Sequence, residues 1–204
     1  MSLILSGDGQ VTGLAVGGLP DGTVDSGTIA TGSILPADLA SGTGGKLLQV
    51  VQTHVTTTSS QAVPGATPTN VNNLNATITP SATDSKILVK IRATGEWSVA
   101  VEYDCVWGIH RDTTVVGSAP AAGVRPLGLA QNNAGYHAAD AASTMDSSTY
   151  EYIDSPATTA AVVYHATIQH RAAGTFYNNR TVTDGDGVNY ERLTSTITLM
   201  EIGA

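Results

Sequence analysis

The chain has 204 residues, enough for one sizeable domain with an appendage. Only 13% of its residues are charged, about half the usual share, and small uncharged residues make up the balance. The net charge is −8 and the nine Lys and Arg residues are scattered. This argues against a nucleic-acid partner, because clustered cations are needed to offset phosphates, and an acidic surface also repels anionic membranes.

The chain has one cysteine, Cys105, so it contains no intrachain disulfide. The apolar run VEYDCVWGI around this residue predicts a buried, inert thiol. The first residues, MSLIL, are too short and lack the basic start of a secretory signal. No apolar run approaches the roughly 20 residues of a membrane span. We therefore expect a protein that folds in a cytosol and does not insert into a membrane.

Residues 1–45 form a Gly-rich arm without Lys or Arg, and the flexible SGTGG at 41–45 predicts a domain boundary. Aliphatic side chains recur in the arm every five residues, at Leu14, Leu19, Val24, Ile29, Ile34 and Leu39. A helix turns about 100° per residue and a flat strand alternates its faces, so neither puts this stripe on one side. We interpret each pentad as a short extended piece followed by a kink that Gly permits.

Six aliphatic residues spread along the arm cannot form a core alone, because their burial does not offset the entropy of ordering the chain. We expect them to form an assembly interface with the β domain, with another protein, or with identical copies around a threefold axis. A disordered linker remains one alternative. A pentapeptide-repeat solenoid, suggested by ADLAS at 37–41, is another.

From Lys46 onward the sequence predicts an all-β domain, 46–204, with no convincing amphipathic helix. In the segment 86–97, Ile87, Val89 and Ile91 are expected on a buried face. The other face, with Lys86, Leu88, Lys90 and Arg92, is expected to be mostly in contact with water. Residues 118–147 are expected to form a long loop, with one helical turn at 137–144. The predicted strands are 46–56, 74–79, 86–97, 99–111, a short strand after a hairpin turn within 111–117, 148–154, 159–171, 174–187 in short pieces, and 193–202. Many short strands with Gly and Pro between them indicate a jelly-roll-like antiparallel β-sandwich.

Five histidines are candidates for metal binding: His54, His110, His137, His165 and His170. His165 and His170 are five residues apart on one predicted strand, so they point to opposite faces and cannot chelate one ion within a chain. His110 or His165 could meet its own copies on a threefold axis and hold a metal or anion there. Packed or surface histidines are the ordinary alternative. The DGDG at 184–187 begins like a calcium loop but lacks the later ligands, which favours a tight turn.

Catalytic motifs are missing from the sequence, since no G-x-S-x-G elbow accompanies its Ser, His and Asp residues. Five glutamates, Glu96, Glu102, Glu151, Glu191 and Glu201, leave a glycan-cleaving carboxylate pair open as an alternative. We predict no enzyme, no catalytic or metal-binding residue and no cofactor.

The segment 175–190 combines aromatic rings, amides and charge, a composition that suits the recognition of sugars or of a host surface. The candidate recognition residues are Phe176, Tyr177, Asn178, Asn179, Arg180 and Tyr190. A polar, solvent-exposed loop is the alternative.

Several phrases, in this order, resemble the C-terminal β domains of tailed-phage fibre and related virion proteins. They are KLLQVVQ (46–52), ITPSATDSKILV (78–89), HRDTTVVG (110–117), YIDSPATTAAVVYHATIQ (152–169) and STITLMEI (195–202). GLPDGTV and ADLASGTGGK resemble the Gly-rich arms that precede such domains. Residues 118–147 and 172–192 depart from the resemblance, and these are the loops in which target specificity would lie.

The resemblance implies a homotrimeric, β-rich structural protein of the virion, assembled in the host cytoplasm. It implies a short fibre, a spike or a tail-fibre-like protein, whose arm contacts other virion proteins and whose β domain faces outward. A capsid decoration or cement protein that stabilises the head is an alternative. A receptor- or glycan-binding tip, with a host surface as its partner, is another.

Overall fold

The computed structural model describes residues 4–5, 11–12, 29–30, 34, 38, 46–98, 104–131 and 143–203. The chain divides into two compact units, Met1–Thr43 and Gly44–Ala204, and the division falls within the SGTGG stretch. In the first unit, β1 (Ile4–Leu5) and β2 (Val11–Thr12) form a short antiparallel pair.

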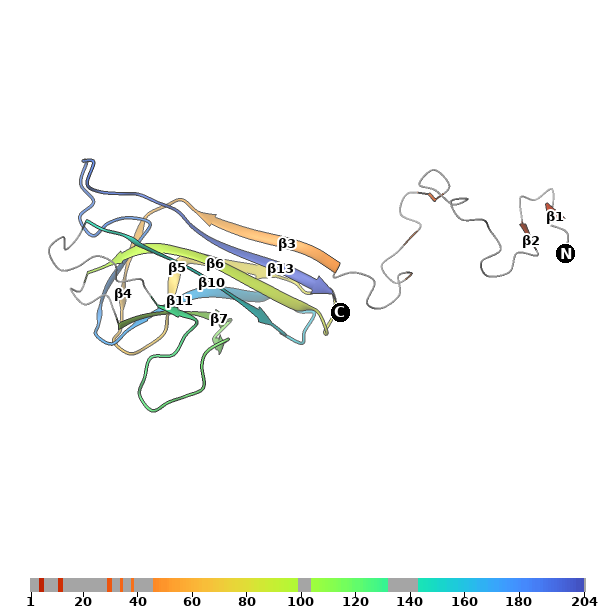
Figure 1. Cartoon of the computed structure of the whole chain (residues 1–204), viewed down its shortest axis with the longest axis horizontal. Helices are drawn as coiled ribbons and strands as arrows, with labels where there is room; N and C mark the ends of the chain where they lie inside the picture. The colour runs from red at the N-terminus through yellow and green to blue at the C-terminus, as the bar shows by residue number, and fades with distance from the viewer. Residues whose placement is uncertain are drawn as a thin grey trace. The chain divides into compact units, whose positions relative to one another are not determined.

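The second unit is all-β, as the sequence predicts, and no α-helix occurs among its described residues. Its antiparallel sheets form a β-sandwich (Figure 1). The strands are β3 (Lys46–Val55), β4 (Ser59–Val63), β5 (Thr69–Ile78), β6 (Lys86–Trp97), β7 (Cys105–Arg111), β8 (Thr114–Val116), β9 (Ala130–Gln131), β10 (Asp146–Asp154), β11 (Val162–His170), β12 (Gly174–Asn178) and β13 (Ser195–Gly203).

The first sheet has the strand order β3-β13-β6-β12-β4, and β10 also pairs with β6. β13 pairs with the first part of β6, from Lys86 to Arg92, whereas β12 pairs with its last part, from Gly95 to Trp97. β12 and β13 therefore follow one another along the same long strand. The second sheet has the order β5-β11-β7-β8, and β9 also pairs with β7.

The core lies between the two sheets and follows the predicted alternation. Ile87, Val89 and Ile91 of β6 have no exposed surface, which confirms the prediction for this strand. Trp107 lies at the centre, with its ring edge-on to Phe176 at a centroid distance of 5.5 Å. The thiol of Cys105 is buried and forms no disulfide, as expected.

Some expected elements differ from those observed. β5 begins at Thr69, five residues before the predicted strand. Its first part was not predicted, because a bulge with Asn73 at φ 62° interrupts the alternation of the strand. The short strand β4 was not predicted, since its sequence SSQAV is mostly polar. Residues 99–103 of one predicted strand lie outside the described residues, as does most of the predicted helical turn at 137–144.

Candidate functional site

The main candidate site is the loop of residues 179–194, which interrupts the long strand formed by β12 and β13. β12 leaves its pairing with β6 at Gly95, and β13 resumes it opposite Arg92, so the loop departs from and returns to one seam of the sheet. The loop projects at the end of the sandwich opposite the start of β3 and the end of β13 (Figure 1).

Asn179 closes the base of this loop. Its side chain is fully buried and its φ is 60°, a left-handed conformation that Asn tolerates better than most residues. Its Nδ2 group donates to the carbonyls of Val55 at 2.8 Å and Thr57 at 3.0 Å. Its Oδ1 accepts from the Ser195 hydroxyl at 2.7 Å, and its backbone N–H donates to the carbonyl of Thr94. One side chain thus joins the end of β3, the loop and the start of β13.

A buried carboxylate fixes the first turn of the loop. Glu96 is 3% exposed, and its Oε2 accepts a 2.6 Å hydrogen bond from the backbone N–H of Val182. A charged acceptor makes such a bond stronger than a neutral one. The start of the loop is therefore held against β6.

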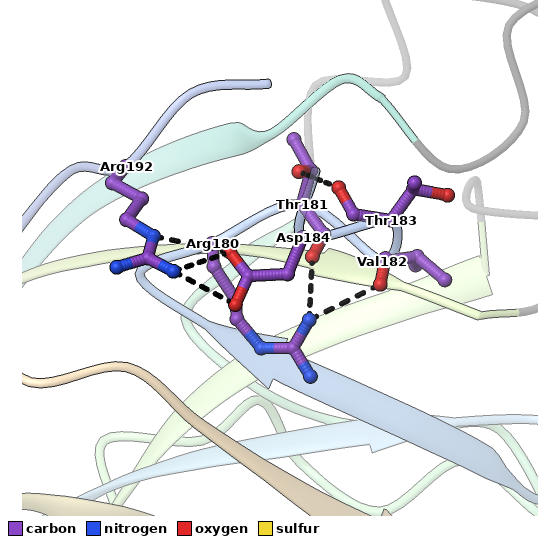
Figure 2. A network of polar contacts seen from close by, with 6 residues as sticks. All are labelled: Arg180, Thr181, Val182, Thr183, Asp184 and Arg192. Carbon is purple, nitrogen blue, oxygen red and sulfur yellow. Dashed lines mark hydrogen bonds and ion pairs between the residues drawn. The ribbon is translucent and has the colours of Figure 1, made fainter. Parts of the chain in front are cut away.

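Two arginines brace the loop from within (Figure 2). The guanidinium of Arg192 makes a two-pronged ion pair with Asp184, with Nη2 2.9 Å from both carboxylate oxygens. Nη1 of Arg180 donates to the carbonyls of Thr181 and Val182 at 3.0 and 3.1 Å. The first Asp of DGDG is thus paired with an arginine. Among the described residues, no group of three or more His, Cys, Asp or Glu side chains is placed to hold a metal.

Three candidate recognition residues lie at the surface of this region. The guanidinium of Arg180 lies 4.4 Å from the centroid of the Tyr177 ring, a cation–π contact. The Tyr190 ring packs against Gly185, where a side chain would collide with it. The loop and the end of β12 thus present two aromatic rings and a cation on a backbone that is held in place.

The other three candidates correct the sequence analysis. Phe176, Asn178 and Asn179 are 0%, 1% and 0% exposed, so the expectation that they face a target is wrong. Phe176 and Asn178 alternate inward along β12, and Phe176 packs against Trp97 and Trp107. The sequence prediction treated a buried strand and the loop after it as one exposed segment.

A second concave feature is an open cleft of about 500 Å³ between β4, β5 and the turn after β7. Nδ1–H of His110 donates to Oδ1 of Asn70 at 2.7 Å, and His110 stands opposite His165 on the neighbouring strand. Burial and then the charge of His165 lower the pKa of His110, and burial lowers that of His165 against the influence of Asp112. Both pKa shifts favour the neutral form of the rings. The two histidines meet each other within one chain, and the threefold arrangement stays a prediction.

Glu96 is too far from Glu201 and from Glu151 to form a hydrolytic carboxylate pair with either. Glu201 is opposite Ile87 of β6, whereas Glu96 lies nine residues further along that strand, roughly 30 Å away. Glu151 is opposite Lys90, six residues or roughly 20 Å from Glu96. Both separations exceed the roughly 5–10 Å of glycosidase carboxylates. Glu191 is exposed on the loop, and Glu102 lies outside the described residues.

Of the six aliphatic residues in the arm stripe, the structure describes two. Ile29 is 39% exposed and Ile34 is 54% exposed. Leu14, Leu19, Val24 and Leu39 lie outside the described residues. The expected assembly interface therefore stays a prediction.

The sequence did not reveal that three residues position the loop. Asn179 closes its base, Glu96 holds its first turn, and Arg192 forms an ion pair within it. The only local signal was an Asn-Asn pair after an aromatic strand, a sequence suited to a left-handed residue. The partners of two of them are distant in sequence, because Val55 is 124 positions from Asn179 and Val182 is 86 positions from Glu96. Asp184 is only 8 positions from Arg192.

Comparison with models of known protein families gives no match, and comparison with curated proteins gives none either. In the part of the chain that the structure describes, no helix has the length and apolar character needed to cross a membrane.

Proposed function

We propose that this chain is a non-enzymatic structural subunit of a phage particle. It forms a homotrimeric short fibre, spike or tail-fibre-like protein, with its arm attached to the particle and its sandwich facing outward. The proposal rests on the nested order in which the strands of the sandwich pair. The sandwich follows a Gly-rich arm that carries a stripe of aliphatic residues.

The nested order supports a jelly roll. When β12 is counted with β13, the first long strand pairs with the last, β3 with β13, and the second with the second-last, β5 with β11. Inside these come β6 with β10 and then β7 with β8. Successive pairs alternate between the two sheets, as in a long antiparallel ribbon that has been rolled up. Jelly rolls of this kind recur in viral capsid proteins and in lectins.

The arm supports assembly. Ile29 and Ile34 are exposed in the single chain. They belong to a stripe with a five-residue spacing, which neither a helix nor a flat strand would place on one side. Three copies around one axis would bury the stripe with a single repeat, because each aliphatic residue then meets its symmetry mates.

Locating the protein on a particle tests the proposal. We expect an antibody against the sandwich to label purified particles of the phage that encodes the chain. Label at the tail would favour a fibre or spike, and label over the head would favour the decoration or cement alternative. Particles that contain no trace of the chain by mass spectrometry would contradict the proposal.

The second candidate function is a receptor- or glycan-binding tip, and the braced loop is the observation that favours it. Tyr177, Arg180 and Tyr190 offer ring faces and a cation that the fold holds in place. The double variant Tyr177→Ala with Tyr190→Ala should reduce adsorption to host cells at least tenfold while assembly stays intact. Val188→Ala, a fully exposed change on the same loop, is the matched control. Unchanged adsorption of the double variant would rule this role out.

A further inference from the structure

The outer face of the six-stranded sheet carries a line of apolar side chains across four strands. Ile153 of β10 is opposite Leu88 of β6, Leu88 is opposite Met200 of β13, and Met200 is opposite Val50 of β3. We call these four residues the apolar row. They face away from the core, because their neighbours Ile87 and Val89 point inward with no exposed surface.

The apolar row differs from the rows of this face that lie nearer the 179–194 loop. Val50 and Ile153 are 52% and 51% exposed, and Leu47 and Leu48 add exposed apolar surface beside them on β3. The next two rows are polar throughout. They consist of Gln52, Thr198, Lys90 and Glu151, and then of His54, Thr196, Arg92 and Thr149. A solvated sheet face is normally polar, and a contiguous exposed apolar patch marks an interaction site.

The cations beside the apolar row lie on β6, and the one carboxylate in the next row, Glu151, is opposite Lys90. Lys86, Lys90 and Arg92 stand exposed along β6, and they are three of only nine cationic residues in an acidic chain. The arm has the opposite character, with no Lys or Arg and with acidic residues at Asp8, Asp21, Asp25 and Asp38. The arm is thus complementary to this face both in charge and in its need for an apolar partner.

The dimensions also agree. Four adjacent strands place the ends of the apolar row about 14 Å apart, since strands lie roughly 4.8 Å from one another. Five extended residues span at most about 16 Å, so two successive aliphatic residues of the arm match the ends of the row. The arm is 45 residues long, which is ample to reach a neighbouring subunit.

We propose that the apolar row binds the N-terminal arm of a second copy of this chain, through aliphatic residues of the segment 14–39. The inference rests on the proposed homotrimer and deepens it by assigning the subunit contact. An arm exchanged between copies buries the row and the stripe together and ties the subunits to one another. The cations of β6 then lie beside the acidic residues of the incoming arm.

Cross-linking between distinguishable copies tests this contact. One tagged, full-length version carries Ile153→Cys, an untagged version carries Ile29→Cys, and the two are co-expressed and treated with a bismaleimide. Native Cys105 has no exposed surface and does not compete. Thr149→Cys on the same strand and face, about 13 Å away, is the matched control in place of Ile153→Cys.

We expect the yield of cross-linked tagged and untagged chains to be at least fivefold higher through position 153 than through position 149. A parallel experiment uses Ile34→Cys in place of Ile29→Cys. Three results would overturn the inference. Position 153 is cross-linked only to position 153 of another copy, or only to the arm of its own chain in a double variant, or to neither arm position. The mass of the untreated sample separates the two proposals. A trimer without the expected cross-link contradicts the arm contact alone, whereas a monomer contradicts the homotrimer as well.

Discussion

The end of the sandwich that follows the arm differs from the end that carries the 179–194 loop, although the same strands build both. At the loop end, Asn179, Glu96 and Arg192 bind partners within the chain, and the loop is held without outside help. At the arm end, Val50 and Ile153 leave apolar surface exposed on the outer face. At one end, contacts within a single chain hold the loop in place, whereas the apolar surface at the other end has the character of an interface.

The largest expected effect on stability is at Asn179, which closes the base of the loop. Asn179→Ala removes buried hydrogen bonds to Val55, Thr57 and Ser195 and puts Ala at φ 60°, so we expect a loss of about 3–5 kcal/mol in unfolding free energy. Asn73→Ala is the matched control, because Asn73 also has a positive φ, 62°, but is exposed. It should cost about 1 kcal/mol. Equal losses in urea denaturation would show that backbone strain alone explains the effect.

The next effect lies at the arm end and depends on pH. Burial tends to raise the pKa of Glu201, but hydrogen bonds from Gln49 and Ser81 outweigh it and hold the pKa at about 2, below the ordinary value of 4.5. Its contribution to stability is therefore complete above pH 4.5 and is lost as the pH falls toward 2.

Glu201→Gln sharpens this point, because the new amide would face the donor of Gln49. We expect a loss of about 2 kcal/mol at pH 7 and a smaller further decline between pH 4.5 and 2 than in the parent protein. Glu151→Gln, at an exposed position of β10, serves as the control and should change little. Parallel pH profiles for the parent and Glu201→Gln would contradict the assignment.

A smaller effect is expected for the brace of the loop. Arg192→Ala breaks the exposed ion pair with Asp184 and should cost about 0.5–1 kcal/mol. Chymotrypsin cleavage after Tyr190 should rise several-fold, because the loop loses a contact that holds it. Arg125→Ala, which removes an exposed cation from another loop, should leave cleavage at Tyr190 unchanged. The same cleavage rate in both variants would show that the loop is not braced by Arg192.

The smallest change in folding stability is expected on the apolar row. Ile153→Asp alters an exposed side chain, so the unfolding free energy should change by at most about 0.5 kcal/mol. Assembly should nevertheless weaken at least tenfold in dilution experiments, because a carboxylate would be buried against the incoming arm. Thr149→Asp on the same face should leave assembly intact. Equal behaviour of the two variants would remove the distinction between the rows.

Local features of the fold were predictable from the sequence. The segment 86–97 matches β6 in both bounds and in its buried face, since period-two alternation is a property of neighbouring residues. The all-β class followed in the same way from the spacing of Gly and Pro. The pairing order was less accessible, because β3 and β13 are separated by most of the domain.

The candidate site was predicted only in part. Phe176 and Asn178 have the composition of a recognition loop, yet tertiary packing puts them in the core, and no local pattern distinguishes the two situations. Tyr177, Arg180 and Tyr190 retain partial exposure. The apolar row was invisible in the sequence, because Val50 and Met200 become neighbours only through strand register.

The mass of the full-length protein in solution tests the proposed homotrimer most directly. Light scattering after size exclusion, over a range of concentrations and in mild detergent, should give one species of three times the 20.8 kDa chain. A stable monomer at every concentration would contradict the account, because the arm stripe and the apolar row would then have no partner.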